Sequence, residues 1–89
     1  MAVAYSVRIL ASARRQLLAL PRPLRERVRL AIRELRDDPR PAGTRLLSGQ
    51  GRERVWRLRV GEYRVLYEIQ DGAAVVLVIR IAHRRNAYR

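Results

Sequence analysis

The chain has 89 residues, and this length predicts one hydrophobic core in a single domain spanning residues 1–89. It contains no cysteine and one histidine, which excludes a disulfide framework and a zinc site built from cysteine or histidine ligands. Its twenty basic residues are all arginine and face only eight acidic ones, for a formal net charge of +12. Such a surface favours a nucleic acid or an acidic protein as partner.

Nothing in the sequence indicates export or a membrane. The N-terminus lacks the apolar core of a signal peptide, and the longest apolar run, Ala73 to Ile79, has the length of a strand. We therefore expect a cytoplasmic protein without a membrane span, and we expect it to need no cofactor.

The N-terminal half predicts a strand and two helices. Residues 3–9 alternate, with Tyr5, Val7 and Ile9 on one side, as in a half-buried strand. Ser12 is a candidate cap for a helix over residues 12–20. Its apolar positions follow helical spacing: Ala13, Leu17, Leu18 and Leu20.

Two prolines, Pro21 and Pro23, separate this helix from a second one. The second helix has a clear apolar stripe: Leu24, Val28, Ala31, Ile32 and Leu35. The short connection predicts an antiparallel helix hairpin. Five arginines occupy another face of this helix, and such charges are most often solvated surface: Arg22, Arg25, Arg29, Arg33 and Arg36.

From residue 45 onward the period changes to two and predicts strands over residues 45–48, 54–60, 63–69 and 73–81. Gly61-Glu62 fits a type II′ hairpin with glycine first, and Asp71-Gly72 marks a second hairpin. The expected fold is therefore α+β: an N-terminal strand, an antiparallel two-helix hairpin and a four-strand antiparallel meander, with the helices on one face of the sheet.

The Gly61-Glu62 turn also predicts the register of its two strands. With a two-residue loop, Arg59 lies opposite Arg64, and opposed residues share a sheet face. The face expected to pack on the helices carries Trp56, Leu58, Val60, Tyr63, Val65 and Tyr67. The other face, expected to be exposed, carries Arg57, Arg59, Arg64, Leu66 and Glu68. Clustered arginines repel one another unless an anion lies between them, and phosphate is the preferred ligand, although pairing with Glu53, Glu62 and Glu68 is the alternative.

The last strand is almost uniformly apolar, so its register is poorly specified. A three-residue turn ending at Gly72 places Arg80 on the arginine face, which favours that register. The residues then expected to face the core are Val75, Leu77, Ile79 and Ile81.

A polar tail, residues 82–89, follows this strand. It brings an acid–base group, His83, close to Arg84, Arg85 and Tyr88. Histidine can carry a proton in either direction, arginine can stabilise a phosphorane or a leaving oxygen, and tyrosine can stack on a base. The tail could therefore complete a site on RNA.

Two segments resemble the RelE branch of the RelE/ParE toxins: residues 56–67, WRLRVGEYRVLY, and residues 81–85, IAHRR, followed by a tyrosine near the C-terminus. The order of the elements is similar over nearly the whole chain. The resemblance implies a fold like that of microbial ribonucleases. It also implies a toxin that inhibits translation as a metal-independent endoribonuclease, cutting messenger RNA in the ribosomal A site with the 2′-hydroxyl as nucleophile. The implied partners are the ribosome, messenger RNA and a cognate antitoxin with an acidic or amphipathic segment.

The resemblance also implies roles for individual residues. Arg57 and Arg59 match the basic pair of the family's central strand. Arg64 matches its transition-state arginine, Arg84 its leaving-group arginine and Tyr88 its base-stacking tyrosine. Arg80 and Arg85 lie beside this set and are expected to contact RNA. No metal ligand is expected.

One departure from the family leaves the general base open. Arg57 and Arg59 stand where the family's type member has lysines, and arginine does not release its proton near neutrality. The candidates are His83, the weaker Glu68, or a group of the ribosomal RNA. Two other functions also remain: a gyrase inhibitor of the ParE type, which shares the fold, and an RNA-binding module without activity.

Overall fold

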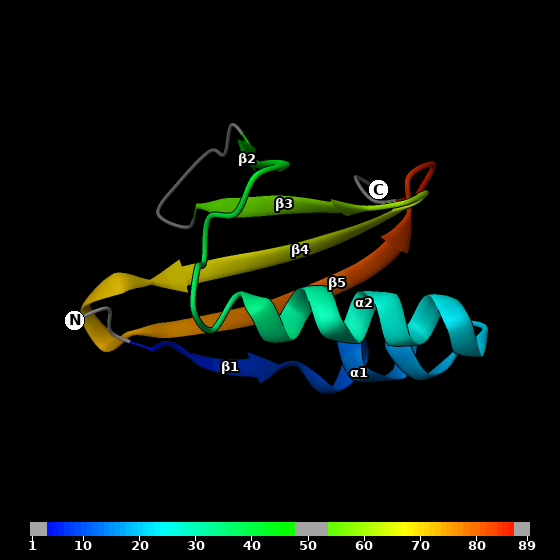
Figure 1. The fold of residues 1–89 in the computed structure, drawn as a ribbon, viewed down its shortest axis with the longest axis horizontal. Helices are drawn as coiled ribbons and strands as arrows, with labels where there is room; N and C mark the ends of the chain where they lie inside the picture. Colours follow the sequence, from blue (N-terminus) through cyan, green and yellow to red (C-terminus); the bar gives the residue numbers. More distant parts are fainter. Residues whose placement is uncertain (1–3, 48–53, 87–89) are drawn as a thin grey trace.

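In a computed structural model, which describes residues 4–47 and 54–86, the elements follow the predicted order (Figure 1). They are β1 (Ser6–Ile9), α1 (Ala11–Leu18), α2 (Arg22–Glu34), β2 (Thr44–Leu47), β3 (Val55–Val60), β4 (Tyr63–Gln70) and β5 (Val75–His83). A short 3₁₀ turn, Asp71–Ala73, joins β4 to β5. The α+β class is confirmed.

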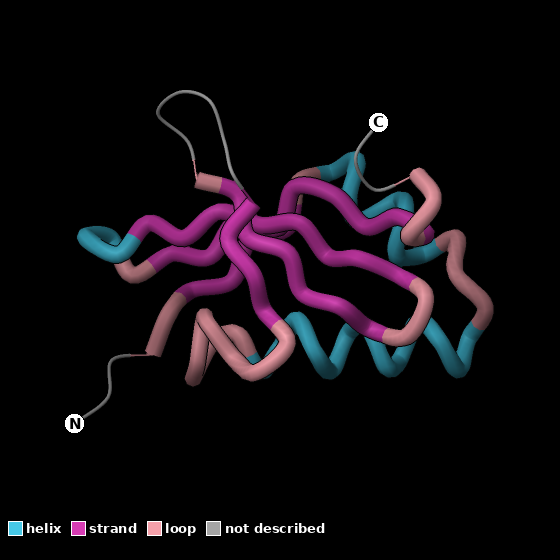
Figure 2. The backbone as a smooth tube through the Cα atoms, turned by 90° about the horizontal axis from the view of Figure 1, so that it is seen from above, coloured by secondary structure: helices cyan, strands magenta, loops and turns pink. Residues whose placement is uncertain are grey.

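The strands form one sheet in the order β1-β5-β4-β3-β2. The four strands from β2 to β5 are an antiparallel meander, as predicted, and β1 joins β5 in parallel. Helix α2 runs along one side of the twisted sheet (Figure 2). Helix α1 follows β1 along β5, where the Gln16 side-chain carbonyl accepts a hydrogen bond of 2.8 Å from the Ile81 N–H. A side chain of α1 thus satisfies a strand N–H beyond the end of β1.

The start of α1 differs from the prediction. The helix begins at Ala11, its N-cap is Leu10, and no side chain caps it. Ser12 therefore lies within the first turn and is not the cap. Ala13 and Leu17 are buried as expected, but Leu18 is 53% exposed. The predicted apolar stripe of α1 was one residue too wide.

The core lies between the helices and one face of the sheet. Helix α2 contributes Val28 and Ile32, and Leu35 follows at its end, all three at most 3% exposed. The sheet contributes alternate residues of β3, β4 and β5: Leu58, Val60, Val65, Tyr67, Val76, Val78 and Ile81. Both helices place their buried residues in this cluster, so the predicted packing of the helices on one face is confirmed.

The β3–β4 hairpin has the predicted register. Val60 pairs with Tyr63, Arg59 with Arg64 and every pair beyond as expected. Gly61 has a φ of +57°, and Glu62 is not among the residues with positive φ, as a type II′ turn requires. This turn sets which side chains of β3 and β4 share a face.

The phase predicted for β5 was wrong over most of the strand. The buried residues are Val76 and Val78, while Val75, Leu77 and Ile79 lie on the other side and are only half-buried. A β-bulge explains the change: Tyr67 pairs with Val78 but Leu66 pairs with Arg80, so Ile79 is an extra residue. Beyond the bulge, Ile81 and Arg80 return to the predicted faces.

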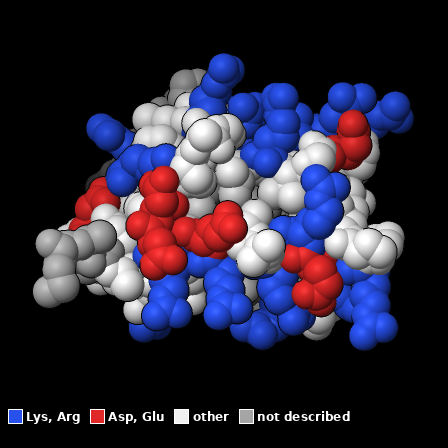
Figure 3. All heavy atoms as spheres, in the orientation of Figure 1, with Lys and Arg blue, Asp and Glu red and all other residues white. Residues whose placement is uncertain are grey.

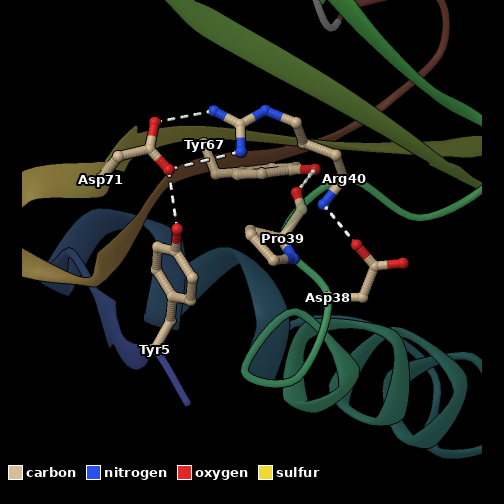
Figure 4. A network of polar contacts seen from close by, with 6 residues as sticks. All are labelled: Tyr5, Asp38, Pro39, Arg40, Tyr67 and Asp71. Atoms are coloured by element: carbon tan, nitrogen blue, oxygen red, sulfur yellow. Dashed lines mark hydrogen bonds and ion pairs between the residues drawn. The ribbon is translucent and has the colours of Figure 1, made fainter. Parts of the chain in front are cut away.

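A polar network ties the β4–β5 turn to the N-terminal segment and to the loop after α2 (Figure 4). Asp71 accepts a hydrogen bond of 2.7 Å from the Tyr5 hydroxyl and forms an ion pair of 2.8 Å with Arg40. The Tyr67 hydroxyl donates to the Pro39 carbonyl at 2.8 Å, and Arg40 lies 4.9 Å from the centre of the Trp56 ring. The network joins segments far apart in sequence at one end of the sheet.

We predict that Asp71→Asn lowers the melting temperature at neutral pH. Arg40 first, and then the Tyr5 hydroxyl, lowers the pKa of Asp71, so folding favours the ionised carboxylate. A lowered pKa contributes stability that is present above the unfolded value, about 3.9, and is lost as the pH falls through the folded pKa. The thermal melts of wild type and variant should converge in acid. Asp37→Asn, an exposed carboxylate in the turn after α2, is the control, and a constant difference down to about pH 2 would contradict this account.

Candidate functional site

The face of the sheet away from the core carries a cluster of arginines on neighbouring strands. In one row across the strands, Arg45 pairs with Arg57, Arg57 with Leu66, and Leu66 with Arg80. In the next row Arg59 pairs with Arg64. We call these five residues, Arg45, Arg57, Arg59, Arg64 and Arg80, the arginine face. The juxtaposition predicted for four of them is confirmed.

This face is less exposed than the sequence predicted. Leu66 is 7% exposed although it lies outside the main core cluster. Its neighbours across the strands are Arg57 and Arg80, whose aliphatic stems can cover apolar surface while their charged ends reach water. The stems of these two arginines are thus placed where they can cover Leu66.

Arg64 is itself buried, at 8% exposure, which corrects the expectation of an exposed side chain. One terminal nitrogen donates to the Tyr63 carbonyl at 3.3 Å, while its Nε is buried without a hydrogen-bond partner among the described residues. An unsatisfied buried donor on a charged group is unfavourable, because the group loses water and gains no acceptor.

A groove of about 370 Å³ opens beside the arginine face. It is lined by Gly43, Thr44, Arg45, Arg57 and Arg59. Arg45 is the site residue that sequence reasoning missed. Its place follows from the β2–β3 register, in which Arg45 faces Arg57, and that register depends on a loop with no short turn signal. Three arginines thus surround a space where phosphate oxygens could bind.

The turn after β5 borders the arginine face. Arg80 donates to the Asn86 carbonyl at 2.6 Å, which holds the turn over the face. Arg84 forms an ion pair of 2.9 Å with Glu62, and its backbone N–H donates to the Glu62 carbonyl at 2.8 Å. The tip of the β3–β4 hairpin therefore holds Arg84 at the rim, with its side chain 54% exposed.

His83 is placed differently from the arginines. It pairs with Tyr63, and Tyr63 packs against the core, so His83 lies on the helix side of the sheet. Its ring meets the Tyr63 ring edge-on at 5.4 Å, and its Nδ1 accepts a hydrogen bond of 3.3 Å from the Arg85 N–H. These contacts give His83 a structural role in the turn. The structure does not bring it together with Arg57, Arg59 and Arg64.

Two predicted RNA contacts complete the set. Arg85 is exposed in the turn after β5. Tyr88 lies outside the described residues.

Within residues 4–47 and 54–86, neither helix combines the length and the apolar character needed to cross a bilayer.

The sequence and the fold of the chain are similar to those of toxins from toxin-antitoxin systems. Residues 7–88 match the family model for the ParE toxin of the type II toxin-antitoxin system parDE. Toxin RelG from Mycobacterium tuberculosis is 37% identical over 89 residues, covering 96% of this chain and 97% of RelG. Both sequences therefore align nearly from end to end.

Solved structures agree with these sequence matches. The archaeal RelE-RelB complex from Pyrococcus horikoshii contains a chain with a TM-score of 0.81 and 26% identity, covering 94% of this chain and 99% of that one. A chain of the RelBE2 complex from Mycobacterium tuberculosis has a TM-score of 0.68 and 32% identity, covering 92% of this chain and 100% of that one. This protein belongs to the RelE/ParE family of toxins of type II toxin-antitoxin systems.

Proposed function

We propose that this toxin is a metal-independent endoribonuclease that cleaves messenger RNA in the ribosomal A site and so stops translation in the cytoplasm. The observation that carries the proposal is the arginine face, which gathers five guanidinium groups on one side of the sheet and includes the buried Arg64. Similarity to toxins named RelE and RelG supports the same activity.

The arginine face fits the charge that develops during RNA cleavage. The 2′-oxygen attacks the adjacent phosphorus, the O2′–P bond forms, the P–O5′ bond breaks, and negative charge gathers on the phosphoryl oxygens. Arg57 and Arg59 hold the phosphate, and Arg64 stabilises the transition state. Fixed cations on a packed sheet can supply a large share of the acceleration without a metal. Arg80 and Arg85 contact the flanking backbone, and Tyr88 stacks on a base.

Two protons must move in this reaction: the 2′-hydroxyl loses one and the leaving 5′-oxygen gains one. Arg84, at the rim, stabilises the leaving oxygen. His83 is directed to the helix side, and the arginines cannot accept a proton, so we assign the base to a ribosomal RNA group. Glu68, on the same sheet face as Arg57, is the alternative within the chain.

A cognate antitoxin is the expected protein partner. The related structures from Pyrococcus horikoshii and Mycobacterium tuberculosis are toxin-antitoxin complexes. We infer that the antitoxin of this chain has an acidic or amphipathic segment that covers part of the basic surface. Opposite charges would accelerate its association with a toxin of net charge +12.

Brief expression of the toxin, followed by mapping of transcript ends and DNA breaks, tests the function. We expect cleavage within translated reading frames, and no cleavage of the same transcript when its start codon is removed. The matched family model carries the ParE name, so gyrase inhibition is the second candidate. Intact transcripts with double-strand breaks in DNA would support that candidate and contradict the ribonuclease. Growth arrest without either lesion would contradict both.

A further inference from the structure

Helix α2 carries a second basic surface, separate from the arginine face. Arg22, Arg25, Arg29 and Arg33 recur at spacings of three and four residues, which places them within an arc of about 80° along about 16 Å of helix. Arg36 follows in the turn directly after α2. We call these five residues the α2 stripe. In Figure 3, basic side chains gather along the lower edge of the molecule, where α2 runs in Figure 1.

The charges of the stripe are not neutralised within the described part of the chain. Arg22, Arg29, Arg33 and Arg36 are exposed, and Arg25 is partly exposed. The sequence offers Glu26 and Asp37 as pairing partners for Arg22 and Arg33. In the described residues, however, neither pair forms, and no stripe arginine takes part in an ion pair. Within the described residues, solvation alone therefore balances these five neighbouring like charges.

The stripe lies on the helix side of the sheet, away from the arginine face. At its C-terminal end, Arg33 and Arg36 line a groove of about 470 Å³ together with residues 4–7 before and in β1. Arg59 of the arginine face lines a groove with Leu30 and Ala31 of α2, and the stripe lies on a different side of that helix. An anion that binds the stripe would therefore be a second surface, distinct from the messenger strand on the arginine face.

The composition of the stripe favours a polyanion over a peptide. A peptide that folds on binding needs apolar anchor positions, and the arc of the stripe contains none. The apolar surface of α2 lies on its other flank, where Leu30 is 56% exposed and lines a shallow groove with Ala31 and Val60. A protein partner would gain more from that flank, whereas a row of phosphates matches a row of guanidinium groups.

We propose that the α2 stripe binds the phosphate backbone of structured RNA and anchors the toxin on ribosomal RNA while the arginine face acts on the messenger. This inference rests on the proposed function, because it assigns the ribosome as the particle that carries both RNAs. The stripe contributes binding and not chemistry.

The test compares two full-length variants that each lose three charges. The stripe variant is Arg22→Gln/Arg29→Gln/Arg33→Gln, and the control is Arg14→Gln/Arg15→Gln/Arg54→Gln, three exposed arginines outside both basic surfaces. Affinities for purified ribosomes and for a 20-base-pair RNA duplex are measured against salt concentration. The stripe variant should bind about tenfold more weakly, with a slope of log affinity against log salt reduced by about two, and the control should change by less than half as much.

Cleavage separates this inference from the proposed function. With the stripe variant, KM for ribosomes should rise while kcat stays near the wild-type value. If the wild type does not cut messenger RNA, the binding measurements still decide the role of the stripe. Equal losses in the two variants would overturn the inference, as would an unchanged salt slope in the stripe variant. Retained ribosome binding with lost antitoxin binding would overturn it in favour of a protein partner.

Discussion

An Arg64→Met toxin is expected to fold and to bind ribosomes, but to cleave messenger RNA at least about 100-fold more slowly than the wild type. Methionine retains most of the buried stem and removes the guanidinium, whose Nε has no hydrogen-bond partner among the described residues. Replacing a buried charge with an apolar side chain of similar volume is often neutral or stabilising. The free energy of unfolding should therefore stay within about 1 kcal/mol of the wild-type value.

Arg64→Ala is the less informative change. Arg64 is 8% exposed, so truncation leaves a cavity and mixes a loss of stability with the loss of a charge. Denaturant unfolding and ribosome pelleting check that Arg64→Met is folded and binds. His83→Ala serves as the matched comparison from the helix side of the sheet, and it should keep most of its cleavage activity. If Arg64→Met cut at the normal rate, the assignment of the site to the arginine face would be wrong.

The sequence predicted the arginine face because one short turn determines it. Once Gly61-Glu62 is recognised as a two-residue hairpin, the alternation of β3 and β4 places Arg57, Arg59 and Arg64 together. The sequence could not predict that Arg64 is buried, because burial depends on how neighbouring side chains cover the face. The sequence also could not predict the position of His83, because its neighbour Arg84 lies at the rim of the arginine face and His83 does not. Its pairing with Tyr63 directs it to the helix side.

The fold was predictable where the pattern is amphipathic and not where it is uniform. In helix α2 the buried residues are apolar, and most of the charged residues are exposed. The start of α2 is signalled by residues next to it in the sequence, Pro21 and Pro23. Strand β5 is apolar on both sides, so hydrophobic alternation cannot choose its phase. The bulge at Ile79 adds one residue between Val78 and Arg80. Even-numbered residues therefore face the core before the bulge, and odd-numbered residues face it after the bulge. A single alternating pattern cannot describe both parts of the strand.

The phase of β5 leads to the second large effect. Val78→Asp should leave the toxin unfolded and inactive, because Val78 is completely buried in the core cluster and a carboxylate there has no partner among the surrounding apolar side chains. An unpaired buried charge costs several kcal/mol, which is comparable with the whole stability of a domain of this size, about 5 kcal/mol. Circular dichroism and the loss of toxicity on expression measure the outcome.

Val75→Asp is the matched change in the same strand. Val75 is half-buried on the opposite side of β5, where it lines a groove with Arg8, so a carboxylate there keeps access to water and gains a nearby cation. This variant should fold, with its free energy of unfolding lowered by no more than about 1 kcal/mol. The opposite result, a folded Val78→Asp and an unfolded Val75→Asp, would mean that β5 takes the phase without the bulge. In that phase Val75, Leu77 and Ile79 would face the core. Val76 and Val78 would then lie on the same side of the sheet as the arginine face.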